Sequence, residues 1–264
     1  MRISAFFVPF FSLIAGIAGF YLRLTELWNI FDSHTGLPER NADITLALIA
    51  FSAVFLFLIL LFSIRVASKH KAQSGFDNAY GTDSLSYPLI ISGVGIIWII
   101  ATVKHILDLI AAGPLLMPDL YFSILSGLAA LSTIFFAVEM FQDPRRKLVY
   151  ALSMVPTVFM CFWLINLYRQ NASNPILLSY SYMCLAVISA ALGFYFTSGF
   201  VYKKPAPGKT IFAYSATIYF CFVALADDYP LTIKIIIASI IAVNLVYSSK
   251  LIRHMRWKSS GAPS

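Results

Sequence analysis

Eight long stretches of apolar residues, separated by short polar connections, constrain this chain more than any other feature of its sequence. A helix needs about 20 mostly apolar residues to cross the hydrocarbon core of a bilayer, and it satisfies its own backbone hydrogen bonds there. The predicted fold class is therefore all-α: a polytopic membrane helix bundle with eight transmembrane helices, forming one integral membrane domain over residues 1–264. The expected helices cover about residues 3–22, 44–67, 87–111, 115–141, 148–168, 176–202, 210–226 and 231–252.

Composition supports a membrane location and argues against a nucleic-acid partner. Hydrophobic residues make up 59% of the chain and charged residues 12%, whereas soluble domains carry about 25% charged residues. The expected partner of most of the surface is therefore the lipid bilayer. The net charge of +7 does not indicate nucleic-acid binding, because the basic residues form short clusters between apolar stretches and no basic face with interleaved aromatic side chains.

Lys and Arg alternate between connections in a way that predicts the orientation of the bundle. Cytoplasmic connections of membrane proteins are enriched in these residues. With the N-terminus on the cytoplasmic side, 14 of the 19 Lys and Arg residues fall on that side. These are Arg2, Arg65, Lys69, Lys71, Arg145, Arg146, Lys147, Lys203, Lys204, Lys209, Lys250, Arg253, Arg256 and Lys258. The other five are Arg23, Arg40, Lys104, Arg169 and Lys234. We therefore predict both chain ends on the cytoplasmic side of a plasma membrane.

Ionisable residues inside the expected helices are costly in lipid and mark candidate sites. In the third expected helix, Lys104, His105 and Asp108 share one face, since residues three and four apart are neighbours on a helix. The predicted topology places further charged residues near the same, outer side. The candidate ligand-binding residues are Lys104, His105, Asp108, Asp119, Arg169, Asp227 and Asp228.

Three interpretations of these polar residues remain open. They could line an externally open cavity for an ion or a small polar solute, or Lys104 and Asp108 could neutralise each other while their stems reach toward the interface. A metal site built from His105, Asp108, Asp119 and His34 is the third, although no His-x-x-x-His or Glu-x-x-His pair supports it. The corresponding functions are a binding or transport protein, a structural or regulatory subunit with a membrane protein partner, and an intramembrane metal-dependent hydrolase.

Transport and enzymatic chemistry lack specific motifs in this sequence. We find no glycine- or proline-broken pair of helices at the membrane midplane, which many transporters use, so the sequence favours binding over transport. Signatures of intramembrane serine and metalloproteases and of glycine-rich nucleotide loops are missing. No cofactor is indicated, and the three cysteines lie in separate apolar stretches without a ligand spacing.

The first external connection is the longest polar segment and a candidate lid over the outer polar residues. Its charged or titratable side chains are Asp32, His34, Glu39 and Arg40. The segment also contains F-D-x-x-T-G-L, with Phe31, Asp32, Thr35, Gly36 and Leu37 as the matching residues. This element resembles a loop in uncharacterised multi-pass membrane proteins of clostridia and related bacteria. The resemblance covers these positions and the helix count, and it implies a bacterial cytoplasmic membrane but no particular activity.

Small residues at four-residue spacing indicate where helices approach closely. In the first expected helix Ser12 precedes Gly16 and Ala15 precedes Gly19 by this spacing, and in the sixth Ser189 precedes Gly193. Such pairs let neighbouring helix backbones come together in a membrane. They predict packing faces and say nothing of a ligand.

Overall fold

Long apolar helices make up most of the chain that the computed structural model describes, namely residues 4–29, 43–71, 76–82, 84–113, 116–139, 148–172 and 176–257. The helices are α1 (Ser4–Asn29), α2 (Asp43–Lys69), α3 (Phe76–Tyr80), α4 (Ser86–Ala112), α5 (Met117–Glu139), α6 (Leu148–Ser153), α7 (Val155–Gln170), a 3₁₀ turn η1 (Leu177–Ser179), α8 (Ser181–Val201), α9 (Pro207–Ala224) and α10 (Leu231–His254). Two short strands, β1 (His70–Lys71) and β2 (Arg256–Trp257), pair antiparallel.

Seven helical segments in the described ranges are long and apolar enough to cross a membrane. They are α1, α2, α4, α5, α8, α10 and the segment that ends in α7. Many of their large apolar side chains are exposed along the helix length, as lipid contact allows and water does not. The chain is therefore a multi-pass, all-helical membrane protein.

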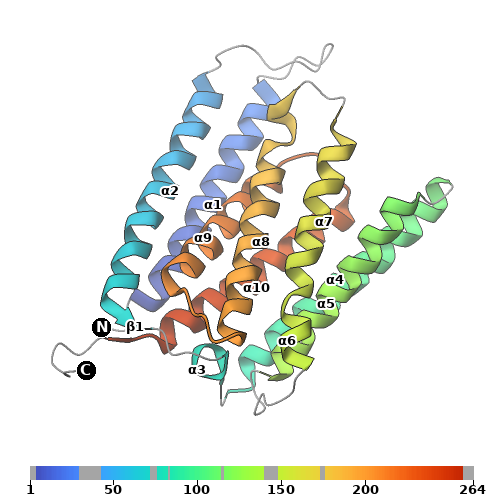
Figure 1. Cartoon of the computed structure of the whole chain (residues 1–264). Coiled ribbons are helices and arrows are strands. Elements are labelled where there is room, and N and C mark those ends of the chain that lie inside the picture. Colours follow the sequence, from blue (N-terminus) through green and yellow to red (C-terminus); the bar gives the residue numbers. More distant parts are fainter. Residues whose placement is uncertain are drawn as a thin grey trace.

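Helix α9 is the most enclosed element of the bundle. It packs against α1, α2, α8 and α10 (Figure 1), and 14 of its 18 residues are buried. Because protein surrounds it, α9 does not need an apolar outer surface. This explains how it carries Tyr214, Thr217 and Tyr219 in its middle.

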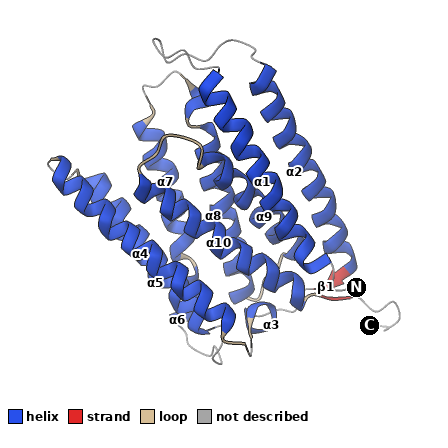
Figure 2. Ribbon diagram, turned by 180° about the vertical axis from the view of Figure 1, so that it is seen from behind, coloured by secondary structure: helices blue, strands red, loops and turns tan. Residues whose placement is uncertain are grey.

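The two ends of the bundle differ in the elements that they carry. We call the lower end in Figure 1 the one at which α1 and α9 begin and α2, α8 and α10 end. Strands β1 and β2 join the ends of α2 and α10 there, and α3 and α6 lie at the same end. The α4–α5 hairpin leans away from the other helices toward its upper tip (Figures 1 and 2).

The helix positions agree with the sequence predictions to within a few residues, apart from two differences. Helix α1 continues to Asn29, beyond its predicted end at residue 22. The segment expected over residues 148–168 is found as one candidate membrane span, Tyr150–Gln170, but it is not one continuous helix, because the chain breaks at Met154 between α6 and α7. The cause is Pro156, which has no backbone N–H for the carbonyl of Leu152, four residues earlier.

Candidate functional site

A buried cluster of three charged side chains lies at the upper end, and we call it the Arg23 cluster: Arg23, Glu26 and Asp227. The Arg23 side chain is 0% exposed. Its Nε donates to Asp227 Oδ1 at 2.8 Å, and its Nη1 donates to Glu26 Oε2 at 2.7 Å. Arg23 and Glu26 share one face of α1 at a three-residue spacing, while Asp227 comes from the connection between α9 and α10. The cluster thus joins segments 204 residues apart in the chain.

Neighbouring groups complete the surroundings of this cluster. Arg23 Nη2 donates to the backbone carbonyl of Leu178 at 3.1 Å, and the guanidinium carbon lies 5.1 Å from the centre of the Tyr182 ring. Thr45 Oγ1, at the start of α2, donates to Glu26 Oε1 at 2.6 Å. The cluster therefore fastens α1 to α2, to the start of α8 and to the α9–α10 connection.

The Arg23 cluster contains more negative than positive charge. One guanidinium faces two carboxylates, and Asp227 Oδ2 is buried without a hydrogen-bond partner among the described residues. Burial raises the pKa of Asp227 to about 6, while Arg23 opposes this shift, Glu26 adds to it and Lys234 lowers it. Asp227 can therefore exchange a proton near neutral pH, and in its ionised form two carboxylates of the cluster share one guanidinium, with Lys234 as a further cation that acts on Asp227.

The prediction from sequence included Asp227 but missed Arg23 and Glu26. It placed Arg23 at the start of an external loop, whereas the structure places it inside α1. A signal was present, since the small residues predicted to form a packing face continue in the same register. The buried residues of this face are Val8, Ser12, Ala15, Gly16, Gly19, Arg23 and Glu26. Charged residues that continue a packing face are expected to be buried and paired.

Lys104 and Asp108 form an ion pair with each other on the surface of α4. Lys104 Nζ lies 2.9 Å and 3.0 Å from the two carboxylate oxygens, and the two side chains are 55% and 52% exposed. This is the geometry of the self-paired interpretation. His105, in contrast, turns toward the bundle, where its Nδ1 lies 3.3 Å from Thr232 Oγ1 and its ring packs on Phe122.

The remaining predicted site residues lie outside the Arg23 cluster. Asp119 is half-buried in the first turn of α5, and Arg169 and Asp228 are exposed. The candidate lid residues Asp32, His34, Glu39 and Arg40 fall in residues 30–42, outside the described ranges, so the lid stays a prediction. In the part of the chain that the structure describes, no three His, Cys, Asp or Glu side chains come close enough to hold a metal ion.

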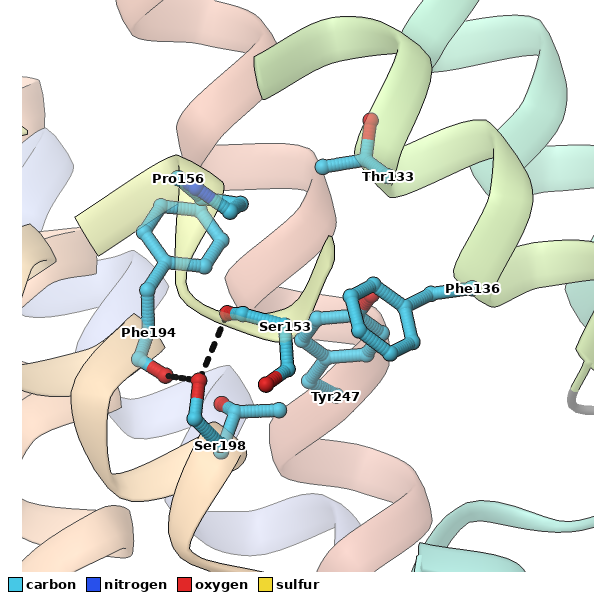
Figure 3. Close-up of a pocket in the computed structure, with 8 residues that line it drawn as sticks. Thr133, Phe136, Ser153, Pro156, Phe194, Ser198 and Tyr247 are labelled. Carbon is cyan, nitrogen blue, oxygen red and sulfur yellow. Dashed lines mark hydrogen bonds between the residues drawn. The ribbon is translucent and has the colours of Figure 1, made fainter. Parts of the chain in front are cut away.

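A small cavity lies nearer the lower end, at the break between α6 and α7 (Figure 3). It lies between α5, α6, α7, α8 and α10, and its volume of about 10 Å³ is no more than one water molecule needs. Its wall includes Phe136, Ser153, Pro156, Thr197, Ser198 and Tyr247.

Hydroxyl groups hold the broken helix in place beside this cavity. Ser132 Oγ donates to the Leu152 carbonyl at 2.8 Å, which replaces the hydrogen bond that Pro156 cannot make. Ser198 Oγ lies 2.6 Å from the Ser153 carbonyl and 3.0 Å from that of Phe194, as Figure 3 shows. The backbone carbonyls freed by the break thus accept hydrogen bonds from α5 and α8, so the fold stabilises the break.

Comparisons of the chain with protein-family models, with curated proteins and with solved structures give no match. The function is therefore argued from the geometry of the described residues.

Proposed function

We propose that the chain crosses the membrane eight times, with α9 as the additional crossing and with both ends on the cytoplasmic side. The separation of charge between the two ends of the bundle supports this orientation. Basic residues gather at the lower end, including Arg65, Lys204, Lys209 and Arg253, whereas Asp43, Asp119, Asp227 and Asp228 lie at the upper end. The positive-inside rule makes the lower end cytoplasmic. The loop resemblance leads us to propose a bacterial cytoplasmic membrane.

Labelling of single cysteines on either side of α9 tests this topology. Cys161, Cys184 and Cys221 are first replaced by serine, and Lys204→Cys or Asp228→Cys is introduced, since both positions are exposed. We expect a membrane-impermeant thiol reagent to label the Asp228→Cys protein in intact cells. The Lys204→Cys protein should react only after the cells are permeabilised. Labelling of both proteins in intact cells would contradict a crossing by α9.

We infer that the activity of this membrane protein is the binding of a proton or small cation at the Arg23 cluster. One observation carries this inference: among the described residues, the buried Oδ2 of Asp227 has no hydrogen-bond partner, and two carboxylates face one guanidinium. An uncompensated charge in a desolvated place is unfavourable. Uptake of a proton or a cation by Asp227 removes it. The ligand is thus positively charged, and Glu26 and Asp227 are the groups that would bind it.

The pH dependence of stability tests whether Asp227 takes up a proton. Its carboxyl ionises near pH 3.8 when exposed and at about 6 when folded. The folded state therefore holds the proton more tightly, and the free energy of unfolding should fall as pH rises through this interval. We expect the melting temperature of the purified protein to fall from pH 4 to pH 6 and level off above that. Asp227→Asn should remove this fall, whereas Asp228→Asn, at the exposed neighbouring position, should retain it.

Cation binding is measured on the same proteins. At constant ionic strength, replacing choline by sodium, potassium, magnesium or calcium should raise the melting temperature at pH 8 for the cation that binds. The effect should vanish at pH 5, where a proton occupies Asp227, and in Asp227→Asn. A melting temperature that depends on pH but not on the cation would show that the cluster binds a proton and none of these cations. If the melting temperature shows neither the pH effect nor the cation effect, ligand binding at the cluster is contradicted.

A structural or regulatory subunit is the second candidate function, and the saturation of Arg23 favours it. The nitrogens Nε, Nη1 and Nη2 of Arg23 all donate hydrogen bonds within the protein. A guanidinium engaged in this way fastens helices together and has little capacity left for an anionic ligand. Under this alternative a membrane protein partner supplies the activity, and the melting temperature shows no cation effect.

A further inference from the structure

One side of helix α4 is turned away from the rest of the bundle and carries apolar and charged side chains together. The α4–α5 hairpin forms an edge of the molecule in both views (Figures 1 and 2), and α4 packs on α5 and α10. We call the outward side the α4 face. Its residues lie three or four positions apart and are all exposed: Ile97, Ile100, Lys104, Leu107, Asp108 and Ala111.

The Lys104–Asp108 ion pair lies in the middle of this apolar surface. Below the pair, Ile97 and Ile100 are exposed. Above Lys104 the helix continues to Ala112, over about 12 Å at 1.5 Å per residue. Exposed apolar side chains line that stretch and continue into the start of α5: Leu107, Ile110, Ala111, Leu116 and Met117. Because apolar surface flanks the pair on both sides, the pair belongs to the part of α4 that crosses the hydrocarbon region.

An ion pair that faces lipid is unfavourable, so this pair points to a further contact. Ionisable residues in membrane helices almost always face protein or a water-filled cavity. Mutual pairing lowers the cost for Lys104 and Asp108, but their side chains are still 55% and 52% exposed. A second protein surface that covers the α4 face would remove both charges from lipid.

The arrangement of the two charges is complementary to itself. All copies of a membrane protein have the same orientation, so two copies that meet face to face are related by a two-fold axis along the membrane normal. The Lys104 side chains then lie at one level and the Asp108 side chains one helical turn above. Lys104 of each copy can approach Asp108 of the other, and each cation gains a second carboxylate neighbour.

We propose that two copies of this chain associate through their α4 faces, with Lys104 and Asp108 of both copies forming a four-charge cluster inside an apolar contact. A different protein would need a pair of opposite charges at the same depth in the membrane, which a second copy supplies by its own sequence. The proposal rests on α4 as a membrane span. It does not depend on ligand binding at the Arg23 cluster, which is on other helices.

Cysteine cross-linking in bilayers tests this contact. In the background without native cysteines, Ile100→Cys places a thiol on the α4 face, one turn below Lys104. Phe57→Cys on α2 is the matched control, because residues 57 and 100 are 60% and 61% exposed and α2 lies at the opposite edge of the bundle. The purified full-length proteins are reconstituted at low density in liposomes and oxidised with copper phenanthroline. Bilayers are used because detergent competes for the same apolar face. We expect disulfide-linked dimers for Ile100→Cys and only chance collisions for Phe57→Cys.

Charge variants in the Ile100→Cys background show whether the four charges form the contact. Lys104→Asp leaves only acidic groups at the centre and Asp108→Lys leaves only basic ones, so each should lower the dimer fraction on the order of tenfold. When the two variants are reconstituted together, one of them with a larger tag, the mixed dimer should recover. Within each copy the ion pair is absent in both variants, so this recovery reports pairing between copies.

Three results would overturn the proposal. The first is an equal dimer fraction for Ile100→Cys and Phe57→Cys, which would show that the purified chain does not associate through α4. The second is a dimer fraction that neither charge variant changes, and the third is a mixed pair that forms no more dimer than either variant alone. If a charge variant does not fold, dilution with lipid decides, because a specific Ile100→Cys dimer persists at densities where Phe57→Cys collisions disappear.

Discussion

Replacing Arg23 by alanine is expected to destabilise the protein more than any other single change of charge in the described region. The substitution leaves Glu26 and Asp227 buried without their cation, and Glu26 is 0% exposed. Breaking a buried ion pair by removing one partner costs about 3–5 kcal/mol. We expect this loss in the free energy of unfolding in mixed micelles, together with poor recovery of folded protein in detergent.

Two further variants decide whether lost pairing causes this effect. Lys104→Ala removes a cation from an exposed pair on α4, where the expected loss is at most about 1 kcal/mol. Arg23→Met combined with Glu26→Gln and Asp227→Asn removes all three charges, and it should recover much of the stability that Arg23→Ala loses. A loss of the same size for Lys104→Ala, or no recovery in the triple variant, would contradict a buried ionic cluster.

The positions of the helices could be predicted because hydropathy depends on the local sequence. The start of α10, for example, was expected at Leu231 and is observed there. Helix α9 shows the limit of this reasoning, because its surroundings decide how apolar it must be. Its polar middle, with Tyr214 and Tyr219, is compatible with a membrane protein since other helices enclose it. No local property of the sequence identifies those neighbours.

The charged site was harder to predict than the helices for a related reason. Lys104 and Asp108 were predicted as candidate binding residues because they are ionisable residues four apart on one face of an expected membrane helix. They do form an ion pair, but on the surface. Arg23 and Asp227 pair across 204 positions. A pairing over that distance depends on which helices pack together, and hydropathy does not contain this information. The register of Arg23 with Gly16 and Gly19 was the available signal.

The break at Pro156 could have been predicted from the residue itself. Proline within a membrane helix removes one backbone hydrogen bond and crowds the preceding turn. Many membrane helices nonetheless continue through a proline when a neighbour satisfies the freed carbonyl. Here Ser132 supplies that hydrogen bond and the helix still separates into α6 and α7. The sequence thus indicated a weak point, and the packing of α5 and α8 determined its form.

Gly19→Val is expected to separate α1 from α9, with the second largest effect on stability. A Cβ at this position would lie 2.8 Å from Val223 Cγ2 and 3.0 Å from Tyr219 Cε2. Tyr219 cannot easily move, because its hydroxyl is hydrogen-bonded to Ser52 on α2. Overpacking of this kind typically costs about 1–3 kcal/mol and more where neighbours cannot yield. We expect a lower free energy of unfolding in mixed micelles and a lower melting temperature.

The same substitution at Gly93 or Gly127 is the matched control for this packing argument. Both glycines lie in long helices, and an added Cβ would meet nothing within 4 Å at either position. Removing a helical glycine there should leave stability unchanged or raise it by up to about 1 kcal/mol. The contrast isolates the contact between α1 and α9 from any general effect of valine in a membrane helix.

Because Arg23 lies one turn beyond Gly19 on the same face of α1, Gly19→Val should also displace Arg23 from Asp227. The fall in melting temperature between pH 4 and pH 6 should then be reduced in Gly19→Val and retained in Gly93→Val. A Gly19→Val protein that keeps both its stability and this pH dependence would show that α1 and α9 do not pack as closely as the structure has them.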